Sequence, residues 1–454
     1  KYFKDRDITK IPAYGPLPVS VPGCVDGWFE MHDKFGQLDI TQIFKPAISY
    51  AREGFPVTEL IGHYLTLSAR RLKDYPNFKE TYMPNGEALK KGDIFKNPDL
   101  ANTYEKIATS GRDAFYEGEI ATVIANFLQA QGGVLTKKDL EQHTSEWVEP
   151  VSTNYRGYDV WELPPNGQGI AALQMLNILE DYPLNEEGFQ APDAVHLMVE
   201  TMRRAYADRA EYLGDSDFWP VPTDSLIDEA YLAGRMADFN MQKATKSDTL
   251  EAGKFTLPTE SFETTHTSVV DGEGNAVSVT TTLNLNYGSK VIVEGAGFFL
   301  NDEMDDFSAK PGTPNFFGLI GNDANAIAPE KRMLSSMTPT IAEKDGKLFL
   351  VLGSPGGSTI ITSVLQVFLN VAEYDMHVDD AVNAYRIHHQ WLPDEVWYEE
   401  GGLTADLEKN IAARGHTWVQ KEFLGKMKAI HALENGQLHG AGDRRNEDDD
   451  VEGY

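Results

Sequence analysis

Hydrophobic positions in the first half of the chain recur at helical spacing. Across residues 27–72, apolar side chains such as Trp28 and Phe35 return every three to four residues, which predicts amphipathic helices. Because proline lacks a backbone N–H, we expect interruptions near Pro46 and Pro56. The same spacing predicts further helices over 101–131, 170–179, 191–212 and 359–371.

Alternating positions predict strands, and these open the second half of the chain. Residues 264–270 and 276–283 are two β-like runs separated by a glycine-rich turn, a pattern that is typical of a β-hairpin. Further strands are expected at 155–161 and 348–352, each followed by a loop rich in turn residues. The segment 215–263 is polar and irregular, so we expect it to be largely exposed.

Composition narrows the classes of protein. With 454 residues, the chain requires two or more structural units or one large α/β body. A net charge of −30 disfavours a nucleic-acid partner, and no apolar stretch approaches the roughly 20 residues of a membrane span. The single cysteine, Cys24, excludes an internal disulfide and a cysteine-based zinc site, so we interpret it as a packing residue.

Thr264 is a candidate nucleophile. A threonine hydroxyl needs a base to take its proton, and the α-amine of the same residue can serve if the chain is cut directly before it. Such an amine has an ordinary pKa of about 7.7–8.0. The polar segment that ends at Glu263 and the β-run that starts Thr264-Thr265-His266 form a suitable place for that cut. The alternative interpretation is an ordinary threonine-rich strand.

The glycine-rich turn at 353–358 is a candidate anion site. Its glycines free backbone N–H groups to point at an anion, and the following helix adds its N-terminal dipole. Such a turn can bind a phosphate or form an oxyanion hole, although the Gly-Lys-Ser/Thr sequence of a phosphate-binding loop is absent here. A plain strand-to-helix turn is the alternative.

Three further polar groups are candidates for binding a substrate or a metal ion. The run Asn301–Phe307 contains four carboxylates, which can bind a metal ion or an ammonium group, or face solvent. The neighbouring hydroxyls of Ser335 and Ser336 can hold a carboxylate. His388 and His389 look like metal ligands, but adjacent side chains point apart on a helix or strand, so joint ligation is not expected.

Together these motifs resemble the γ-glutamyltransferase family over essentially the whole chain. The matching stretches are 22–57, 155–158, 205–209, 212–215, 264–266, 301–308, 334–337, 353–358 and 388–393. The resemblance implies the four-layer αββα sandwich of N-terminal-nucleophile hydrolases, a mixed α/β (α+β) fold. It also implies a precursor that cuts itself into a large-subunit portion, 1–263, and a small subunit, 264–454.

The resemblance implies roles in catalysis for four residues. Thr264 resembles the nucleophile of self-cleavage and of turnover, and Thr282 resembles the threonine that hydrogen-bonds the nucleophile. Gly356 and Gly357 resemble the oxyanion-hole pair. Thr264 would attack a γ-glutamyl amide, and the resulting γ-glutamyl ester would be released to water or to an amino-acid or peptide acceptor. No cofactor or metal is implied.

Five residues resemble those that bind the substrate. Ser335 and Ser336 resemble the hydroxyls that hold the α-carboxylate, and Asn284, Glu303 and Asp306 resemble the groups that receive the α-ammonium. A γ-glutamyl group is a zwitterion at its far end, so a site for it needs both kinds of partner at a fixed distance from the nucleophile.

Three departures from the family pattern bear on this assignment. The family's arginine for the substrate carboxylate lies in a segment upstream of Lys1, so we expect the chain as written to be a poor enzyme. Phe317, in the lid-like stretch 307–322, stands where relatives often carry a tyrosine that hydrogen-bonds an asparagine. Asn166-Gly167-Gln168-Gly169 replaces the more common Ser-Ser-Gly-Gly, which leaves room for a different acyl substrate.

Other functions stay open at this point. A cephalosporin or glutaryl acylase shares the fold, but its substrates lack the α-ammonium for which Asn284, Glu303 and Asp306 are suited. A catalytically silent binding homologue would be expected to lose Thr264 or the glycine pair, and all are present. A phosphate-binding protein is disfavoured by the acidic charge.

The resemblance also implies partners and a location. We expect glutathione and other γ-glutamyl compounds as substrates, amino acids, peptides or water as acceptors, and a pair of large and small subunits from one precursor. A periplasmic or secreted bacterial location is expected, with the signal segment outside this chain.

Overall fold

The computed structural model describes residues 2–6, 8, 10–73, 77–250 and 264–454. They form two compact units: unit 1 comprises 1–10, 148–282 and 305–454, and unit 2 comprises 11–147 and 283–304. Neither unit follows the boundary expected between residues 263 and 264. That boundary concerns where the chain is cut rather than which parts pack together, so the division into subunits stays a prediction.

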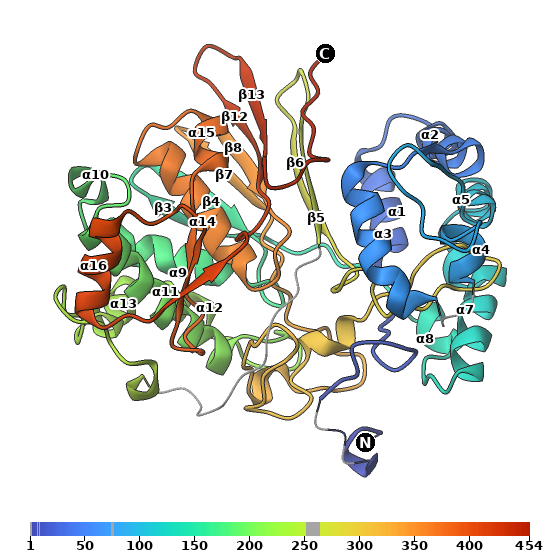
Figure 1. The fold of residues 1–454 in the computed structure, drawn as a ribbon, viewed down its shortest axis with the longest axis horizontal. Coiled ribbons are helices and arrows are strands. Elements are labelled where there is room, and N and C mark those ends of the chain that lie inside the picture. The colour runs from blue at the N-terminus through green and yellow to red at the C-terminus, as the bar shows by residue number, and fades with distance from the viewer. Residues whose placement is uncertain (1, 7, 9, 74–76, 251–263) are drawn as a thin grey trace. The chain divides into compact units, whose positions relative to one another are not determined.

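Unit 1 is built on two packed β-layers (Figure 1). The larger is a six-stranded antiparallel sheet in the order β13-β12-β8-β7-β4-β3. Its strands are β3 (Val151–Tyr155), β4 (Tyr158–Glu162), β7 (Thr340–Lys344), β8 (Lys347–Gly353), β12 (Lys428–Ala432) and β13 (Leu438–Gly442). The second layer is the hairpin β5 (Thr265–Val270) and β6 (Ala276–Thr281), which packs on β7, β8 and β12.

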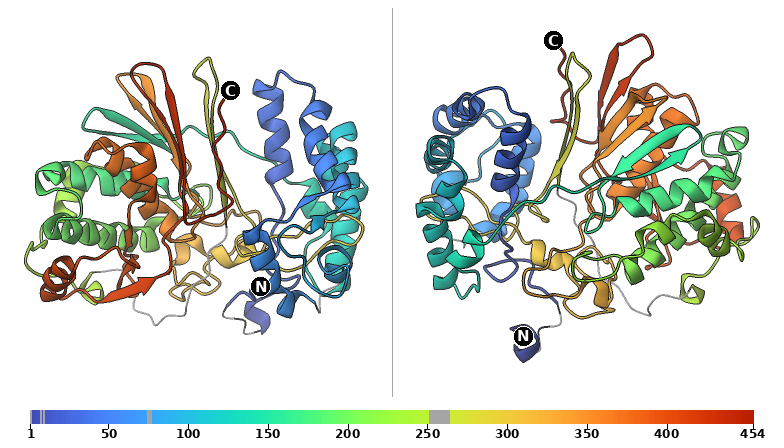
Figure 2. Two further views of the ribbon diagram at one scale, coloured as in Figure 1. Left: turned by 45° about the horizontal axis from the view of Figure 1, so that its top comes forward. Right: turned by 180° about the vertical axis from the view of Figure 1, so that it is seen from behind.

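Helices cover the six-stranded sheet and bury one another (Figure 2). α9 (Gly169–Glu180) packs on β3 and β4, α14 (Thr359–Ala372) packs on β8, and both helices contact each other. α11 (Pro192–Tyr212) lies on α9. Residues 359–371 of α14 are all buried, including a polar face whose side chains are hydrogen-bonded: Thr362 to His388, Ser363 to the carbonyl of Leu424, Gln366 to that of Ile387 and Asn370 to that of Ala381.

The remaining elements of unit 1 are shorter. A three-stranded sheet has the order β11-β10-β9. The bounds are α10 (Leu184–Glu187), α12 (Thr223–Leu226), α13 (Glu229–Arg235), α15 (Val378–Asn383), α16 (Ala405–Arg414), β9 (Ile387–His388), β10 (Val396–Glu399), β11 (Trp418–Lys421), η1 (Lys4–Arg6), η2 (Ser247–Thr249) and η4 (Asp323–Asn325). The boundary between the units falls within η3 (Glu303–Asp306).

Unit 2 is mainly helical. Its elements are α1 (Cys24–Phe35), α2 (Ile40–Glu53), β1 (Phe55–Pro56), α3 (Glu59–Leu72), α4 (Phe78–Tyr82), β2 (Ile94–Phe95), α5 (Pro98–Ser110), α6 (Arg112–Tyr116), α7 (Glu119–Ala130) and α8 (Lys137–Glu141). Its core joins α7 to the distant segment 291–300, because Ile120, Ile124 and Leu128 pack with Val293 and Leu300. Within the described parts of the chain, no helix is long and apolar enough to cross a membrane.

Three predicted elements are wrong in detail. Pro46 lies inside α2: its fixed φ is a helical value, and the helix continues although the proline lacks an N–H and its ring crowds the carbonyl four residues earlier. The predicted helix 101–131 is divided at Gly111, whose φ of 75° is outside the helical region, and again at Gly118, whose ψ of −151° is extended, into α5, α6 and α7. The predicted strand 155–161 is a hairpin, because Arg156 and Gly157 both have positive φ and form a two-residue turn between β3 and β4.

Other predicted elements are confirmed. The hairpin at 264–283, the strand at 348–352 and the helices at 170–179, 191–212 and 359–371 correspond to β5–β6, β8, α9, α11 and α14. The expected exposed segment 215–263 contains α12, α13 and η2. Its part 251–263, with the Glu263 side of the expected cleavage, lies outside the described residues.

Candidate active site

Thr264 and Thr282 meet at one end of the β5–β6 hairpin. Thr264 comes directly before β5, and Thr282 directly follows β6. Because Thr265 pairs with Thr281 in the hairpin register, the next pair along the ladder is Thr264 and Thr282. Their hydroxyl oxygens are 3.2 Å apart, with Thr264 as donor. The geometry allows Thr282 to orient the Thr264 hydroxyl.

His266 fixes the hairpin to the strand that leads into the glycine-rich turn. A Cβ atom on Gly353, the last residue of β8, would lie 2.2 Å from Cε1 of the His266 ring, so only glycine fits beneath this ring. The ring nitrogens of His266 contact the hydroxyls of Thr280 at 2.8 Å and Ser268 at 3.0 Å. Burial lowers the pKa of His266 to about 3, so the ring is neutral and has a structural role.

Gly356 and Gly357 adopt backbone conformations that favour glycine. Their φ values are 145° and 53°. A Cβ atom on Gly356 would lie 2.9 Å from the Cα of Gly425, and one on Gly357 would lie 2.8 Å from the Phe317 ring. Both space and conformation therefore require glycine here.

The backbone N–H groups of Gly356 and Gly357 belong to buried residues and are available to donate hydrogen bonds to a ligand. The carbonyl of Gly356 accepts from the Thr359 backbone at 3.0 Å, and that of Gly357 accepts from Ile360 at 3.2 Å. Among the described residues, by contrast, neither the N–H of Gly356 nor that of Gly357 has an acceptor. Buried N–H groups are almost always paired, so a pair of this kind is suited to receive an oxyanion.

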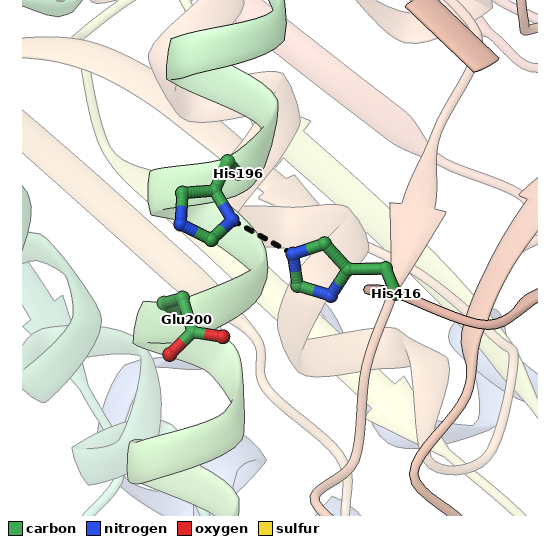
Figure 3. A group of neighbouring side chains, drawn as sticks. All are labelled: His196, Glu200 and His416. Carbon is green, nitrogen blue, oxygen red and sulfur yellow. Dashed lines mark hydrogen bonds between the residues drawn. The ribbon is translucent and has the colours of Figure 1, made fainter. Parts of the chain in front are cut away.

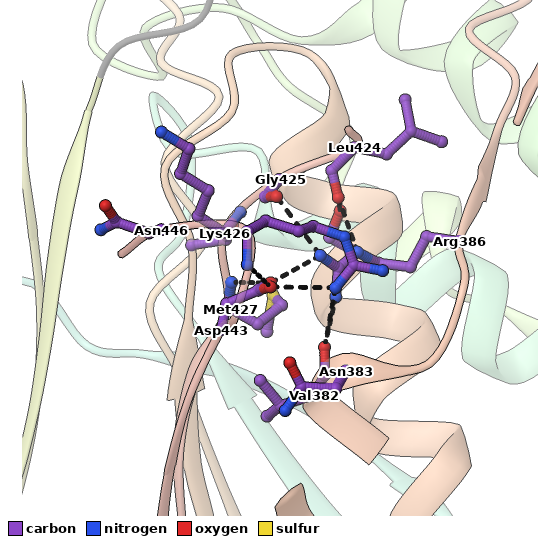
Figure 4. Close-up of polar contacts among 12 residues, drawn as sticks. Val382, Asn383, Arg386, Leu424, Gly425, Lys426, Met427, Asp443 and Asn446 are labelled. Carbon is purple, nitrogen blue, oxygen red and sulfur yellow. Dashed lines mark hydrogen bonds and ion pairs between the residues drawn. The ribbon is translucent and has the colours of Figure 1, made fainter. Parts of the chain in front are cut away.

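The buried ion pair of Arg386 and Asp443 lies next to the segment that packs on the glycine-rich turn 353–358 (Figure 4). Arg386 contacts the carboxylate of Asp443 at 2.6 Å and donates to the backbone carbonyls of Leu424 and Gly425. The next residue, Lys426, donates its backbone N–H to the hydroxyl of Ser354 at 2.9 Å. Arg386 therefore holds the segment on which Gly356 packs.

Phe317 covers Gly357. Its ring is 3% exposed, and its backbone carbonyl accepts from the Gln390 side chain at 3.3 Å. The side chain of Asn315 accepts from the backbone N–H groups of Phe317 and Leu319. The lid-like stretch is therefore held by hydrogen bonds between its backbone and the side chains of Asn315 and Gln390, and none of these bonds uses the Phe317 ring.

Ser335 and Ser336 are half-buried, and both hydroxyl oxygens act as acceptors. Ser335 Oγ accepts from the backbone N–H of Met337 at 3.4 Å, and Ser336 Oγ accepts from Nε2 of Gln168 at 3.4 Å. Among the described residues, neither hydroxyl hydrogen has an acceptor. Both hydroxyls can therefore donate to a ligand, as a carboxylate requires.

The acidic run 301–307 is not a solvated stretch. Asp302 and Asp305 are 0% and 5% exposed, and burial raises the pKa of Asp305 to about 6. Asp306 is half-buried, and its carboxylate accepts from the Asn315 side chain at 3.5 Å. Because the backbone carbonyl of Asp306 also accepts from Asn325 at 2.7 Å, its position is well defined.

Asn284 and Glu303 belong to unit 2, whereas the other seven predicted site residues belong to unit 1. Asn284 has a φ of 74°, and its side chain donates to the carbonyl of Asp302 at 3.3 Å. The Glu303 backbone N–H donates to the side chain of Asn301 at 3.3 Å. Both residues are buried, and their proposed role toward the ammonium stays a prediction.

His388 and His389 are held by separate partners. His388 contacts the hydroxyl of Thr362 at 2.8 Å and the side chain of Gln390 at 3.0 Å. His389 contacts Asp394 at 3.4 Å. Burial lowers the pKa of both rings, to about 3 and about 4, so they are neutral residues of the core.

His196, Glu200 and His416 form a buried group that the sequence did not indicate (Figure 3). His196 Nδ1 and His416 Nε2 are 2.7 Å apart, and His196 Nε2 lies 2.9 Å from the carbonyl of Asn240. His416 Nδ1 faces Arg203 at 3.5 Å. Because arginine only donates, His416 Nδ1 is an acceptor, and each ring nitrogen in this chain of bonds has one complementary partner.

Glu200 is likewise occupied by its neighbours. Its carboxylate contacts Arg203 at 3.3 Å and Arg204 at 2.7 Å, and it accepts from the backbone of Thr245 at 3.0 Å. These groups lower the pKa of Glu200 against the opposing effect of burial, and burial lowers the pKa of His416 to about 3. We interpret the group as a closed hydrogen-bond network, since a cation would compete with two arginines.

Sequence reasoning also missed the connection between Arg209 and Ser336. Arg209 on α11 is 4% exposed, and its Nε donates to Oε1 of Gln168, the residue whose amide nitrogen faces Ser336. Burial lowers the pKa of Arg209 to about 10, against the opposing effects of Tyr206 and the Asp306 carboxylate, so the guanidinium stays charged at neutral pH. The one sequence signal for a role of Arg209 was its place in the stretch 205–209, which matches the family pattern.

Comparison with known proteins places these motifs in one family. The family profile described as Gamma-glutamyltranspeptidase matches residues 1–453. A glutathione hydrolase proenzyme of Escherichia coli (strain K12) is 45% identical over 440 residues, which are 96% of this chain and 76% of that protein. An Acylase ACY 1 proenzyme of Pseudomonas sp. (strain SE83) is 36% identical over 94% of this chain and 74% of its own length.

A solved structure agrees with the fold. The cephalosporin acylase from Bacillus halodurans superposes with a TM-score of 0.87 at 29% identity, over 98% of this chain and 80% of that one. The fold class expected from the sequence is confirmed.

Proposed function

The chain belongs to the gamma-glutamyltranspeptidase family, and we propose that it is a self-cleaving γ-glutamyltransferase and glutathione hydrolase. The observation that carries the proposal is the contact between the Thr264 and Thr282 hydroxyls at 3.2 Å, at the end of a hairpin packed on the strand that leads into the glycine-rich turn. A nucleophile, a group to orient it and a pair of unbonded N–H groups are the parts that acyl transfer requires.

In the first step, the Thr264 hydroxyl attacks the carbonyl carbon of Glu263. The peptide bond becomes an ester on Thr264 Oγ1, and water hydrolyses this ester. The products are a new carboxylate on Glu263 and a free α-amine on Thr264. That amine is the only base that turnover then needs, because it lies on the nucleophilic residue itself.

In the second step, the freed Thr264 attacks the γ-carbonyl of the substrate. The backbone N–H groups of Gly356 and Gly357 stabilise the oxyanion of the tetrahedral intermediate, and the amine proton is passed to the leaving group. The product is a γ-glutamyl ester of Thr264. Attack by water gives glutamate, and attack by an amino-acid or peptide amine gives a γ-glutamyl peptide.

The substrate's charged end is held by two kinds of group. Ser335 and Ser336 donate to its α-carboxylate, for which their free hydroxyl hydrogens are suited. Asp306 receives its α-ammonium, a role that the family resemblance also implies for Asn284 and Glu303. Holding both charges fixes the γ-carbonyl relative to the nucleophile and so contributes to the rate as well as to affinity.

An acylase that accepts side chains without an ammonium group is the second candidate. The 36% identical Acylase ACY 1 and the superposable cephalosporin acylase favour it. The half-buried carboxylate of Asp306 argues against it, because that carboxylate has no counter-charge to meet in a glutaryl substrate.

The two candidates are separated by substrate comparison. We expect release of glutamate from glutathione, formation of a γ-glutamyl dipeptide when an amino acid is added, and kcat/KM for a γ-glutamyl anilide at least about tenfold above that for a glutaryl anilide. Preference for the glutaryl anilide would support the acylase. Self-cleavage without turnover of either anilide would contradict both.

We also propose that the enzyme acts in the periplasm or outside the cell, on extracellular glutathione and related γ-glutamyl compounds. The family resemblance implies this location, and the single cysteine, Cys24, is compatible with an oxidising compartment because one thiol cannot form an internal disulfide. The test is activity in the periplasmic and culture fractions of the native host, with a cytoplasmic marker enzyme as control.

A further inference from the structure

Arg209 carries a buried positive charge that forms no ion pair among the described residues, although the Asp306 carboxylate raises its pKa. Its Nε donates to Gln168 and its Nη1 donates to the carbonyl of Ile320 at 3.1 Å. Within the described parts of the chain, no carboxylate forms an ion pair with Arg209, and its Nη2 meets no acceptor. The buried arginines Arg204 and Arg386, by contrast, each contact a carboxylate. Because a buried guanidinium is stabilised best by an anion in direct contact, and its direct contacts here are neutral, a ligand carboxylate can supply that anion.

Gln168 connects this charge to the serine pair, and its orientation is determined by chemistry. Arginine has no acceptor, so the Gln168 atom that faces Arg209 must be the amide oxygen. The amide nitrogen then points to Ser336 Oγ at 3.4 Å. Because a lone pair of Ser336 is thereby occupied, its hydroxyl hydrogen points away from Gln168. Arg209 thus sets the direction in which Ser336 donates, through one intervening side chain.

We propose that Arg209 and Gln168 are positioning residues, which hold the Ser336 hydroxyl as a donor to the substrate α-carboxylate and balance its negative charge. The proposal rests on the proposed γ-glutamyl activity and extends it to the residues that select for the carboxylate. A chain with the common Ser-Ser-Gly-Gly sequence has no side chain in place of Gln168. This chain therefore has its own means of orienting the serine.

The test compares two substitutions of similar volume at Gln168. Gln168→Met removes both hydrogen bonds. Gln168→Glu instead pairs with Arg209, neutralises its charge and accepts the Ser336 proton, so that the hydroxyl turns away from the substrate. The probes are a γ-glutamyl anilide and the matching 4-aminobutyryl anilide, which lacks only the α-carboxylate, both measured as initial rates over a range of substrate concentrations.

We expect KM for the γ-glutamyl anilide to rise about tenfold in Gln168→Met and about a hundredfold in Gln168→Glu, with smaller changes in kcat. Kinetics on the 4-aminobutyryl anilide should change less than threefold in either variant. Arg209→Lys keeps the charge but loses the Nε donor, so its KM should lie between those of the wild type and Gln168→Glu. Self-cleavage of each precursor shows that the variant has folded.

Two results would overturn the proposal. One is an equal loss on both anilides, which would mean a general disturbance of the site. The other is unchanged γ-glutamyl kinetics in both Gln168 variants. A failure of the proposed function is distinct from both, because the self-cleaved wild type would then turn over neither anilide.

Discussion

The histidine network around His196, which is buried, and the half-buried serine pair Ser335–Ser336 use their hydrogen-bonding capacity differently. In the network, each ring nitrogen of His196 and His416 has a complementary partner, and the Glu200 carboxylate is occupied by two arginines and a backbone N–H. In the serine pair both oxygens accept, while both hydroxyl hydrogens have no acceptor among the described residues.

This difference separates a structural group from a binding group. His196, Glu200 and His416 are residue types that bind metal ions. In this network, however, each polar group already has a hydrogen-bond partner, so the network should contribute to stability rather than bind a ligand. The serines look unremarkable in sequence, yet their remaining donors can be used only by something that binds. Substitutions should therefore change unfolding in the first group and kinetics in the second.

The largest effect on kinetics is expected at Thr264, the nucleophile of the site to which the serine pair belongs. Thr264→Ala should leave one uncut chain on a denaturing gel and abolish turnover, because both steps use the same hydroxyl. Its melting temperature should stay close to that of the uncut wild-type precursor. Two fragments from this variant would remove Thr264 from the mechanism.

The next largest effect is expected at Asp306. Asp306→Ala should lower kcat/KM for a γ-glutamyl anilide roughly ten- to a hundredfold, since a charge-assisted hydrogen bond contributes about 1.5–3 kcal/mol. Self-cleavage should continue, because the ammonium site is not needed to cut the backbone. Asp323→Ala is the matched control, since Asp323 is exposed and its carboxylate forms no ion pair among the described residues. Equal kinetics in the two variants would favour the acylase.

A smaller effect of a different kind is expected in the histidine network. His416→Ala should lower the free energy of unfolding by about 1–3 kcal/mol, because it leaves buried groups of His196 and Arg203 without a partner. In the mature enzyme, KM and kcat should stay within twofold of the wild type. His63→Ala, at an exposed histidine, is the control for both measurements. A change in KM without a change in stability would mean that the network belongs to the site.

The smallest effect concerns pH and follows from the same network. Burial lowers the pKa of His416 to about 3, whereas in the unfolded chain it is near 6.5, so the unfolded state takes up the proton first. The stability that neutral His416 contributes is therefore complete above pH 6.5 and is lost as the pH falls toward 3. When the pH falls from 7 to 6, the free energy of unfolding of the wild type should decrease by about 0.7 kcal/mol more than that of His416→Ala. Urea unfolding at the two pH values measures this, and identical losses would contradict a neutral His416.

Local sequence chemistry was enough to predict the hairpin and the glycine-rich turn, whereas the pairing of Thr282 with Thr264 was implied only by the family resemblance. The turn between β5 and β6 fixes the register that brings Thr264 to Thr282, and successive glycines between a strand and a helix predicted the turn at Gly356. The spacing of apolar residues was less reliable where the conformation of a single residue decides whether a helix or strand continues. Arg156 with Gly157 formed a hairpin turn inside an apparent strand, and Pro46 did not end its helix.

Long-range contacts could not be predicted in this way. Gln168 and Ser336 are 168 positions apart, and nothing local to either indicates that they meet. Helical spacing places charged residues on an exposed face, yet Arg203 and Arg209 are buried because other parts of unit 1 enclose α11 on all sides. The acidic run 301–307 could be interpreted from the sequence as solvent-exposed. Asp302 and Asp305 are buried because segments distant in the sequence cover them, which local pattern does not show.

The most direct test of the account is the N-terminal sequence of the smaller fragment of the wild-type protein. We expect two fragments after purification, with the smaller one beginning Thr264-Thr265-His266 and carrying all γ-glutamyl label when the acyl-enzyme is trapped with substrate. A chain that stays whole while it turns over substrate, or a fragment that begins at another residue, would contradict the claim that Thr264 is the N-terminal nucleophile.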